Sequence, residues 1–116
     1  LYLQWYVYLA NALQPPFRTW FYPTEAAGAD AADAAKDAAR ARIEAIFALL
    51  DAHLGAHGPH LLGENLSAVD FFLVMLMRWS RNMPKPATMW PHLAALAARL
   101  KARPSFATLY AREGLT

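Results

Sequence analysis

One stretch near the middle of the chain constrains the fold most, because it predicts both the start and the burial of a helix. Ser67 is a residue type that caps helix N-termini, and Asp70 lies three positions on, where its carboxylate can accept the Ser67 amide. Leu66 and Phe71 flank this cap as a hydrophobic staple. Seven consecutive apolar residues, 71–77, then form the longest apolar run, far short of the roughly 20 residues that span a bilayer. We therefore predict a central, buried helix that starts at Ser67.

The rest of the chain has the apolar periodicity of helices rather than the alternation of strands. We expect five helices, at about residues 2–22, 31–54, 68–81, 91–101 and from 104 to a stop at Gly114, with a polar connection over 24–35. Pro15 and Pro16 interrupt the first helix, which predicts a kink near residues 11–14. The predicted fold class is all-α: one domain over residues 1–116, built as a five-helix orthogonal bundle.

The composition excludes several classes of protein. Hydrophobic residues make up 57% of the chain and charged residues 17%, which excludes an intrinsically disordered chain. The net charge is only +2 and the basic residues are scattered, so we expect no nucleic-acid partner. The chain contains no cysteine, which excludes disulfides, thiolate catalysis and Cys-ligated zinc within it. No signal peptide is recognisable, and we expect a cytoplasmic protein without a membrane partner.

Two features could be taken for a metal site or a catalytic group, but the sequence around them does not favour either interpretation. His53 and His57 have the one-turn spacing of some zinc sites, but Gly55 and Gly58 predict that the helix breaks there. We therefore expect no metal site. Asp70 is explained as the partner of the helix cap and not as a catalytic carboxylate.

Three segments together resemble the C-terminal helical domain of the cytosolic glutathione transferases. They are the capping stretch 62–70, the pair 90–93 and 103–106, and the closing residues 113–115. The resemblance covers almost all of the chain, and the aromatic first helix is most similar to the bacterial beta-type members. It implies that the chain is part of a longer protein. The thioredoxin-like N-terminal domain of that protein, absent from this chain, binds glutathione and carries the catalytic residue.

The resemblance also implies roles for particular residues. Gln14 falls where beta-type enzymes have a histidine near the glutathione sulfur, Phe17 falls in the co-substrate pocket, and Trp79 matches a pocket tryptophan on the central helix. Trp5 and Tyr8 are placed in the aromatic core of the first helix. From the residues alone, Gln14 is equally consistent with a solvated polar position, and Trp79 with simple core packing.

The implied function is that of a bacterial detoxification enzyme that conjugates glutathione to electrophilic apolar compounds. This domain would form the hydrophobic co-substrate pocket and part of a homodimer interface, with glutathione as a co-substrate and no cofactor. No catalytic residue is expected in these 116 residues, so the isolated chain should be inactive, and its aromatic first helix should make it self-associate. The alternative is a non-catalytic binding or assembly module of the same fold.

Overall fold

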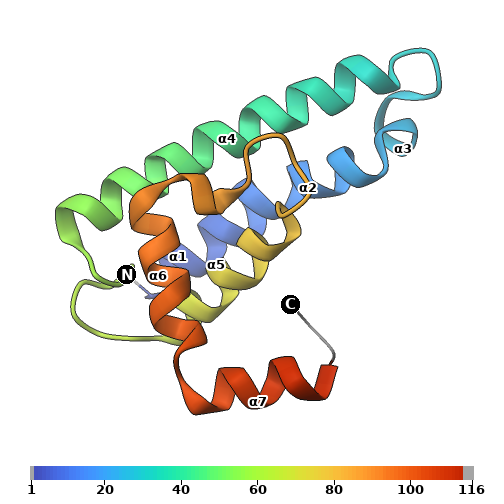
Figure 1. Cartoon of the computed structure of the whole chain (residues 1–116). Coiled ribbons are helices and arrows are strands. Elements are labelled where there is room, and N and C mark those ends of the chain that lie inside the picture. The colour runs from blue at the N-terminus through green and yellow to red at the C-terminus, as the bar shows by residue number, and fades with distance from the viewer. Residues whose placement is uncertain (1, 114–116) are drawn as a thin grey trace.

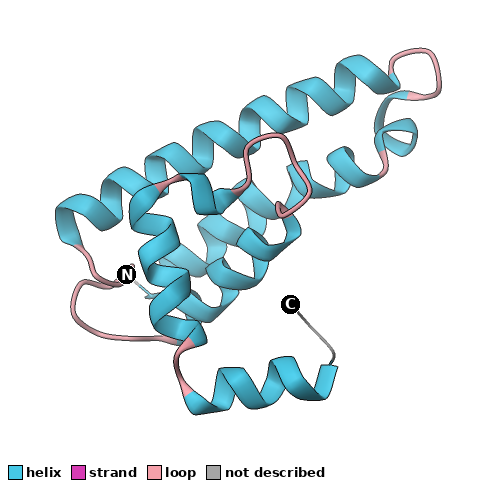
Figure 2. Ribbon diagram, in the orientation of Figure 1, coloured by secondary structure: helices cyan, strands magenta, loops and turns pink. Residues whose placement is uncertain are grey.

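The computed structural model describes residues 2–113, without the side chains of residues 26, 107, 109 and 110. Within the described part, helices and connecting loops make up the chain, which confirms the all-α fold class (Figure 2). Gly114, the predicted stop of the last helix, and Leu115, in the third segment of the resemblance, lie outside the described residues. None of the described helices is long and apolar enough to cross a membrane.

The described elements reproduce the predicted order of helices and add two short ones. In chain order they are α1 (Tyr2–Tyr8), η1 (Leu9–Leu13), α2 (Gln14–Phe21), α3 (Pro23–Ala27), α4 (Ala32–His57), α5 (Ala68–Trp79), η2 (Ala87–Met89), α6 (Pro91–Lys101) and α7 (Pro104–Glu113). The predicted first helix corresponds to α1, η1 and α2 together. The added helix α3 corrects the prediction of a polar connection: Pro23, expected only to end a helix, also stands at the first position of the next one.

The disruption expected near residues 11–14 takes the form of a π-helical turn. In η1 the Gln14 amide donates to the carbonyl of Leu9, five residues back, instead of four. Pro15 and Pro16 have no amide hydrogen to donate, so the widened turn lies directly before the point where the helical hydrogen-bond ladder is interrupted. Leu9 and Leu13 of this turn are fully buried, so the irregular segment is part of the core.

The predicted break between His53 and His57 is wrong, because α4 runs through Gly55 and ends only at His57, with Gly58 as its C-cap. The His92 ring of α6 explains the glycine: a Cβ at position 55 would lie 2.8 Å from His92 Nε2. A glycine inside a helix costs about 1 kcal/mol relative to alanine, and here it allows α6 to approach α4 closely.

The core lies around α5 (Figure 1). α4 packs along α2 and α6, and α5 contacts α1, η1 and α6. This confirms the predicted central, buried helix, since six of the twelve residues of α5 are buried. The fully buried side chains of the core include Leu9, Leu13, Phe17, Ile43, Phe47, Leu50, Leu61, Leu73, Leu76, Leu93, Leu96 and Leu100. Figure 1 shows α7 at the far side of the bundle from α4.

The first helix is buried mainly in its second half. α1 has no buried residue, and Trp5 and Tyr8 are only partly buried against the core. Tyr2 and Tyr6 are exposed, and the Tyr6 ring lies 5.1 Å from the ring of Phe72 on α5. The aromatic surface of α1 is therefore only partly covered by this chain.

Candidate functional site

The start of α5 has the capping-box arrangement between Ser67 and Asp70. The Ser67 amide donates to Asp70 Oδ2 at 3.0 Å, which is the carboxylate half of the box. The other half is looser: Ser67 Oγ has no well-aligned hydrogen bond to a described residue, and the Asp70 amide donates to the Ser67 carbonyl at 3.1 Å. The carboxylate therefore contributes more to this cap than the hydroxyl does.

Asp70 also holds the loop that precedes α5. Its Oδ1 accepts the amide of Leu61 at 3.0 Å, and its Oδ2 lies 3.8 Å from Nδ1 of His60. The side chain is 0% exposed, so these partners replace the water that a carboxylate would otherwise bind. The sequence pattern revealed the contact to Ser67 but not the contact to Leu61, which arises only when the loop folds back.

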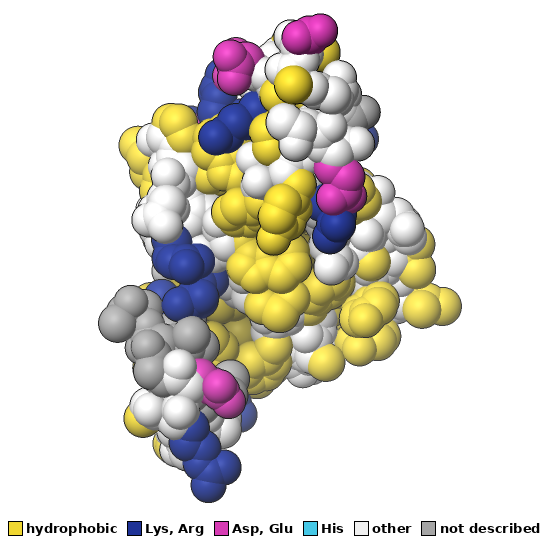
Figure 3. All heavy atoms as spheres, turned by 90° about the vertical axis from the view of Figure 1, so that its right-hand side faces the viewer, with side chains coloured by type: hydrophobic (Ala, Val, Ile, Leu, Met, Phe, Trp, Pro, Cys, Tyr) yellow, Lys and Arg dark blue, Asp and Glu magenta, His cyan; other side chains and the backbone are white. Residues whose placement is uncertain are grey.

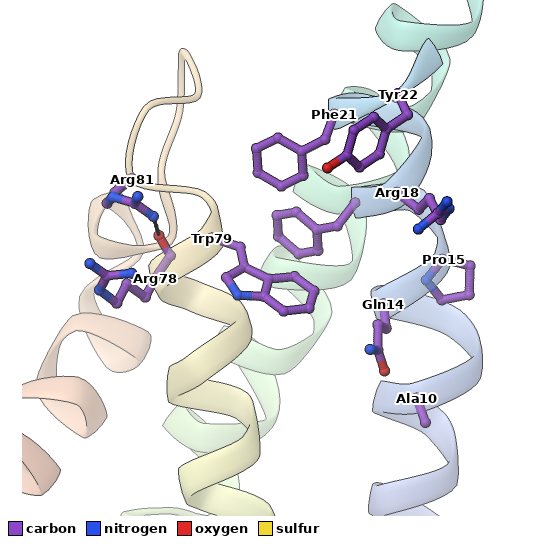
Figure 4. Close-up of a pocket in the computed structure, with 10 residues that line it drawn as sticks. Ala10, Gln14, Pro15, Arg18, Phe21, Tyr22, Arg78, Trp79 and Arg81 are labelled. Carbon is purple, nitrogen blue, oxygen red and sulfur yellow. Dashed lines mark hydrogen bonds between the residues drawn. The ribbon is translucent and has the colours of Figure 1, made fainter. Parts of the chain in front are cut away.

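A cleft of about 760 Å³ lies between α2 and the C-terminal end of α5 (Figure 4). Its walls are formed by Ala10, Gln14, Pro15, Phe17, Arg18, Phe21, Tyr22, Arg78, Trp79 and Arg81. The structure thus brings Gln14, Phe17 and Trp79 together in one cavity, although 65 positions separate the first residue from the last. Four of the ten lining residues are aromatic, namely Phe17, Phe21, Tyr22 and Trp79, which is typical of sites for small organic ligands.

The aromatic side chains of the cleft form a floor and two walls. Phe17 is fully buried, and its ring centre lies 5.7 Å from that of Trp79 in an edge-to-face arrangement. Phe21, one turn further along α2, is 50% exposed with its ring centre 6.4 Å from that of Phe17. Trp79 is partly buried against the core and also lines the cleft, so the two interpretations of this residue are compatible.

Gln14 is the polar side chain opposite Trp79. It is the first residue of α2, directly after the π-helical turn, and is half-buried. Figure 4 shows Gln14 on α2 and Trp79 on α5 at opposite sides of the cleft. The carboxamide can both donate and accept a hydrogen bond, so it offers an uncharged polar contact to a ligand.

The sequence analysis did not predict the basic character of the cleft. Arg18 forms a two-point ion pair with Glu25, with Nε and Nη2 each 2.9 Å from a carboxylate oxygen. Both side chains are exposed. The hydrogen bond from Arg18 lowers the pKa of Glu25, and the same bond raises the pKa of Arg18. The partners lie on different helices, α2 and α3, so helical periodicity gives no signal for the pair.

Two further arginines lie at the end of α5, where a buried serine fixes the following loop. Ser80 is fully buried; its Oγ donates to the Met77 carbonyl at 2.5 Å and accepts the Ala87 amide at 2.9 Å. Arg81 donates from Nη1 to the Arg78 carbonyl at 3.1 Å. This bonding ends the helix at Trp79 and sets the position of both arginines at the edge of the cleft.

The histidines of α4 are used structurally. His53 Nε2 lies 2.9 Å from the Leu61 carbonyl, and the rings of His53 and His57 are 5.2 Å apart. The described residues contain no group of three or more His, Asp or Glu side chains arranged to hold a metal ion.

Comparisons with known proteins agree with this architecture. The sequence model of the family described as "Glutathione S-transferase, C-terminal domain" matches residues 12–112. Among solved structures, the ternary complex of BphK, a bacterial GST, is similar with a TM-score of 0.82 and 28% sequence identity. The similarity covers 97% of this chain and 52% of that protein, so the chain spans about half the length of BphK. No curated protein matches. The chain belongs to the glutathione S-transferase C-terminal domain family.

Proposed function

We propose that this chain forms the co-substrate pocket of a glutathione transferase whose thioredoxin-like domain binds glutathione and activates its thiol. The observation that carries the proposal is the convergence of Gln14, Phe17 and Trp79 on one cleft of about 760 Å³. A concave cavity in which aromatic side chains lie beside polar ones suits a small organic electrophile with an apolar body. The similar protein BphK is described as a bacterial GST in a ternary complex, which supports a ligand-binding role.

In the proposed reaction, the glutathione thiolate attacks an electrophilic carbon of the bound compound. A carbon–sulfur bond forms, and a leaving group departs with its electron pair. This chain would supply binding and orientation: Phe21 and Trp79 hold the apolar body, and the buried floor at Phe17 keeps water out. Such positioning accelerates a two-substrate reaction without any catalytic side chain of this domain.

We further propose that the complete protein is a cytoplasmic, bacterial homodimer that acts in detoxification. The first helix exposes four apolar side chains, those of Tyr2, Leu3, Tyr6 and Val7. An exposed apolar area of this kind favours contact with a second subunit that covers it. Their exposure also supports self-association of the isolated chain, with helices α1, α2 and α4 at the contact. Sedimentation over a concentration series tests this, and a monomer at high concentration would contradict it.

Steady-state kinetics of the two-domain protein, with both substrates varied, test the pocket. Trp79→Ala and Phe21→Ala should raise the KM for an apolar electrophile about ten-fold, because contact area with that substrate is lost. The KM for glutathione should stay unchanged. Met89→Ala is the matched control, since Met89 is exposed but does not line the cleft.

A changed KM for glutathione with an unchanged KM for the electrophile would contradict the proposed placement. A two-domain protein that binds apolar ligands in the cleft but never conjugates them would favour the alternative, a non-catalytic binding module.

A further inference from the structure

We propose that one end of the cleft binds a negative charge, so that the pocket selects aromatic electrophiles carrying an anionic group such as a carboxylate or sulfonate. This inference rests on the proposed function and names a substrate class for the same site. It depends on Arg78 and Arg81, the two basic residues at the end of α5.

The charges around the cleft are unbalanced. Three of the ten lining residues are arginines, and none of the ten is acidic. Arg18 is neutralised by its two-point ion pair with Glu25. Arg78 and Arg81 form no ion pair with an acidic side chain in the described part of the chain. Two positive charges therefore remain uncompensated at the α5 end.

A second cavity beside the first extends this basic region. It has a volume of about 130 Å³ and is lined by Arg78 and Arg81 as well, together with Thr88 and Lys101. No acidic residue lines it among the described residues. Guanidinium and hydroxyl donors are the groups that bind carboxylate and sulfonate oxygens in proteins.

Arg78 has an unused hydrogen-bond donor. Its Nε is enclosed by the protein and has no acceptor among the described residues. Because Nε is enclosed, a ligand can reach Arg78 only through its terminal Nη1 and Nη2 groups, which are not enclosed in this way. The planar guanidinium fork matches a carboxylate in two-point geometry.

The position of these arginines at a helix C-terminus explains only part of their bonding. Basic side chains are favourable there because they face the unpaired carbonyls. The bond from Arg81 to the Arg78 carbonyl is of this kind, but it uses one of the five N–H donors that a guanidinium carries. Apart from the enclosed Arg78 Nε, the remaining donors of both residues are available to a ligand.

The cleft therefore has two chemically different parts. Figure 4 shows the guanidinium groups of Arg78 and Arg81 on the far side of Trp79 from Gln14. Figure 3 shows a continuous apolar area on this face of the molecule with basic side chains at its edges. A ligand that fits both parts has an aromatic body against Trp79 and an anionic group directed toward the end of α5.

Two fluorescent probes with the same ring system test this inference on the 116-residue chain. The first is 8-anilinonaphthalene-1-sulfonate, and the second is N-phenyl-1-naphthylamine, which lacks the sulfonate. In the double variant Arg78→Gln/Arg81→Gln, the anionic probe should bind about ten-fold more weakly, while binding of the neutral probe stays unchanged. Added salt should weaken binding of the anionic probe only.

Three variants make the result specific. Arg103→Gln removes an exposed arginine that lines neither cavity, so it should leave both probes unaffected. The double variant Arg78→Lys/Arg81→Lys keeps the charges and should retain the salt-sensitive binding. Trp79→Ala should weaken the binding of both probes, because Trp79 lines the cleft. This result would show that both probes bind there.

An equal effect of the glutamine variant on both probes, or no effect on either, would overturn the charge selection while leaving the apolar pocket intact. Binding that does not respond to Trp79→Ala, or no binding of either probe, would contradict the proposed pocket itself and this inference with it.

Discussion

The two ends of α5 differ. A buried carboxylate, that of Asp70, lies at the N-terminal end, whereas residues at the C-terminal end line the cleft. The start of the helix uses Asp70 to hold two backbone amides, those of Ser67 and Leu61, inside the protein. The end of the helix presents Trp79 and Arg78 to the cavity instead, and Arg78 forms no ion pair with an acidic side chain in the described structure. The N-terminal end of this helix thus stabilises the fold, and its C-terminal end has side chains that can bind a ligand.

This difference has a simple physical basis. A polar group whose partners are backbone atoms of the same chain stabilises the fold and cannot also bind a ligand. A polar group left without a partner weakens the fold slightly but is available for recognition. Substitutions at the start of α5 should therefore change stability, and those around the end should mainly change binding. Substitutions in the core, in the cap and on the surface test that division.

Phe17→Ala should have the largest effect on stability, because this residue of α2 belongs to the core as well as to the cleft. Its ring is fully buried between Trp79 and Phe47, so its removal should lower the free energy of unfolding by about 3–5 kcal/mol. Phe21→Ala is the matched control on the same helix. It is half exposed and should cost less than about 1 kcal/mol while still weakening ligand binding. Urea unfolding measures the free energy of unfolding of both variants. Equal decreases would contradict the assignment of Phe17 to the floor of the cleft and Phe21 to its wall.

Asp70→Asn should destabilise the chain by about 2–3 kcal/mol, because two charge-assisted hydrogen bonds are weakened in a fully buried position. Ser67→Ala should cost only about 1 kcal/mol. The sequence alone predicts similar effects for the two residues, while the contact to Leu61 predicts unequal ones.

Unfolding midpoints of both single variants and of the double variant decide between these expectations. The two losses should not add, since the residues share one hydrogen-bonded unit. In the fraction of each variant that remains folded, the affinity of the cleft for the probes should be unchanged. If these variants lost probe binding but kept their stability, the proposed difference between the two ends of α5 would be wrong.

Glu25→Gln should have the smallest effect on stability. The pKa of Glu25 is lowered by its hydrogen bond from Arg18. Its contribution is therefore present above the unfolded carboxyl pKa of about 4.3 and is lost as the pH falls through the lower folded value. Both side chains are exposed, so the variant and the original chain should differ at pH 7 by no more than the scatter of an unfolding measurement.

The same variant sharpens the charge inference. Without Glu25, Arg18 has no counter-charge, and the anionic probe should bind more tightly while the neutral probe does not. A clear loss of stability at pH 7, absent at pH 3, would show that this surface pair contributes to the fold more than its exposure suggests.

Local patterns predicted those parts of the fold that depend on neighbouring residues. The cap at Ser67 and the start of α6 at Pro91 follow from residue type and spacing, and both stand where predicted. The prolines at 15 and 16 predicted a disrupted helix, although not its π-helical form. Gly55 was misread as a break, because the reason for that glycine is His92, 37 positions away.

The resemblance assigned roles to uncharged residues of the candidate site, and those roles remain predictions; no pattern pointed to its arginines. Resemblance to a family placed Gln14, Phe17 and Trp79 in a pocket, and all three line the same cleft. Nothing in the spacing of Arg78 and Arg81 separates ligand-binding arginines from the basic residues that commonly end a helix.

By itself, the sequence determined the order of the helices, the buried α5 and the cap that starts it, because apolar periodicity and capping act over a few residues. Only the tertiary structure decided which side chains share the cleft, which arginine is neutralised and how many partners Asp70 has. Each of these depends on contacts between segments far apart in the chain or across a break between helices, such as Arg18 with Glu25 and Leu61 with Asp70. Burial and pairing of charges are properties of the packed molecule, and no local pattern encodes them.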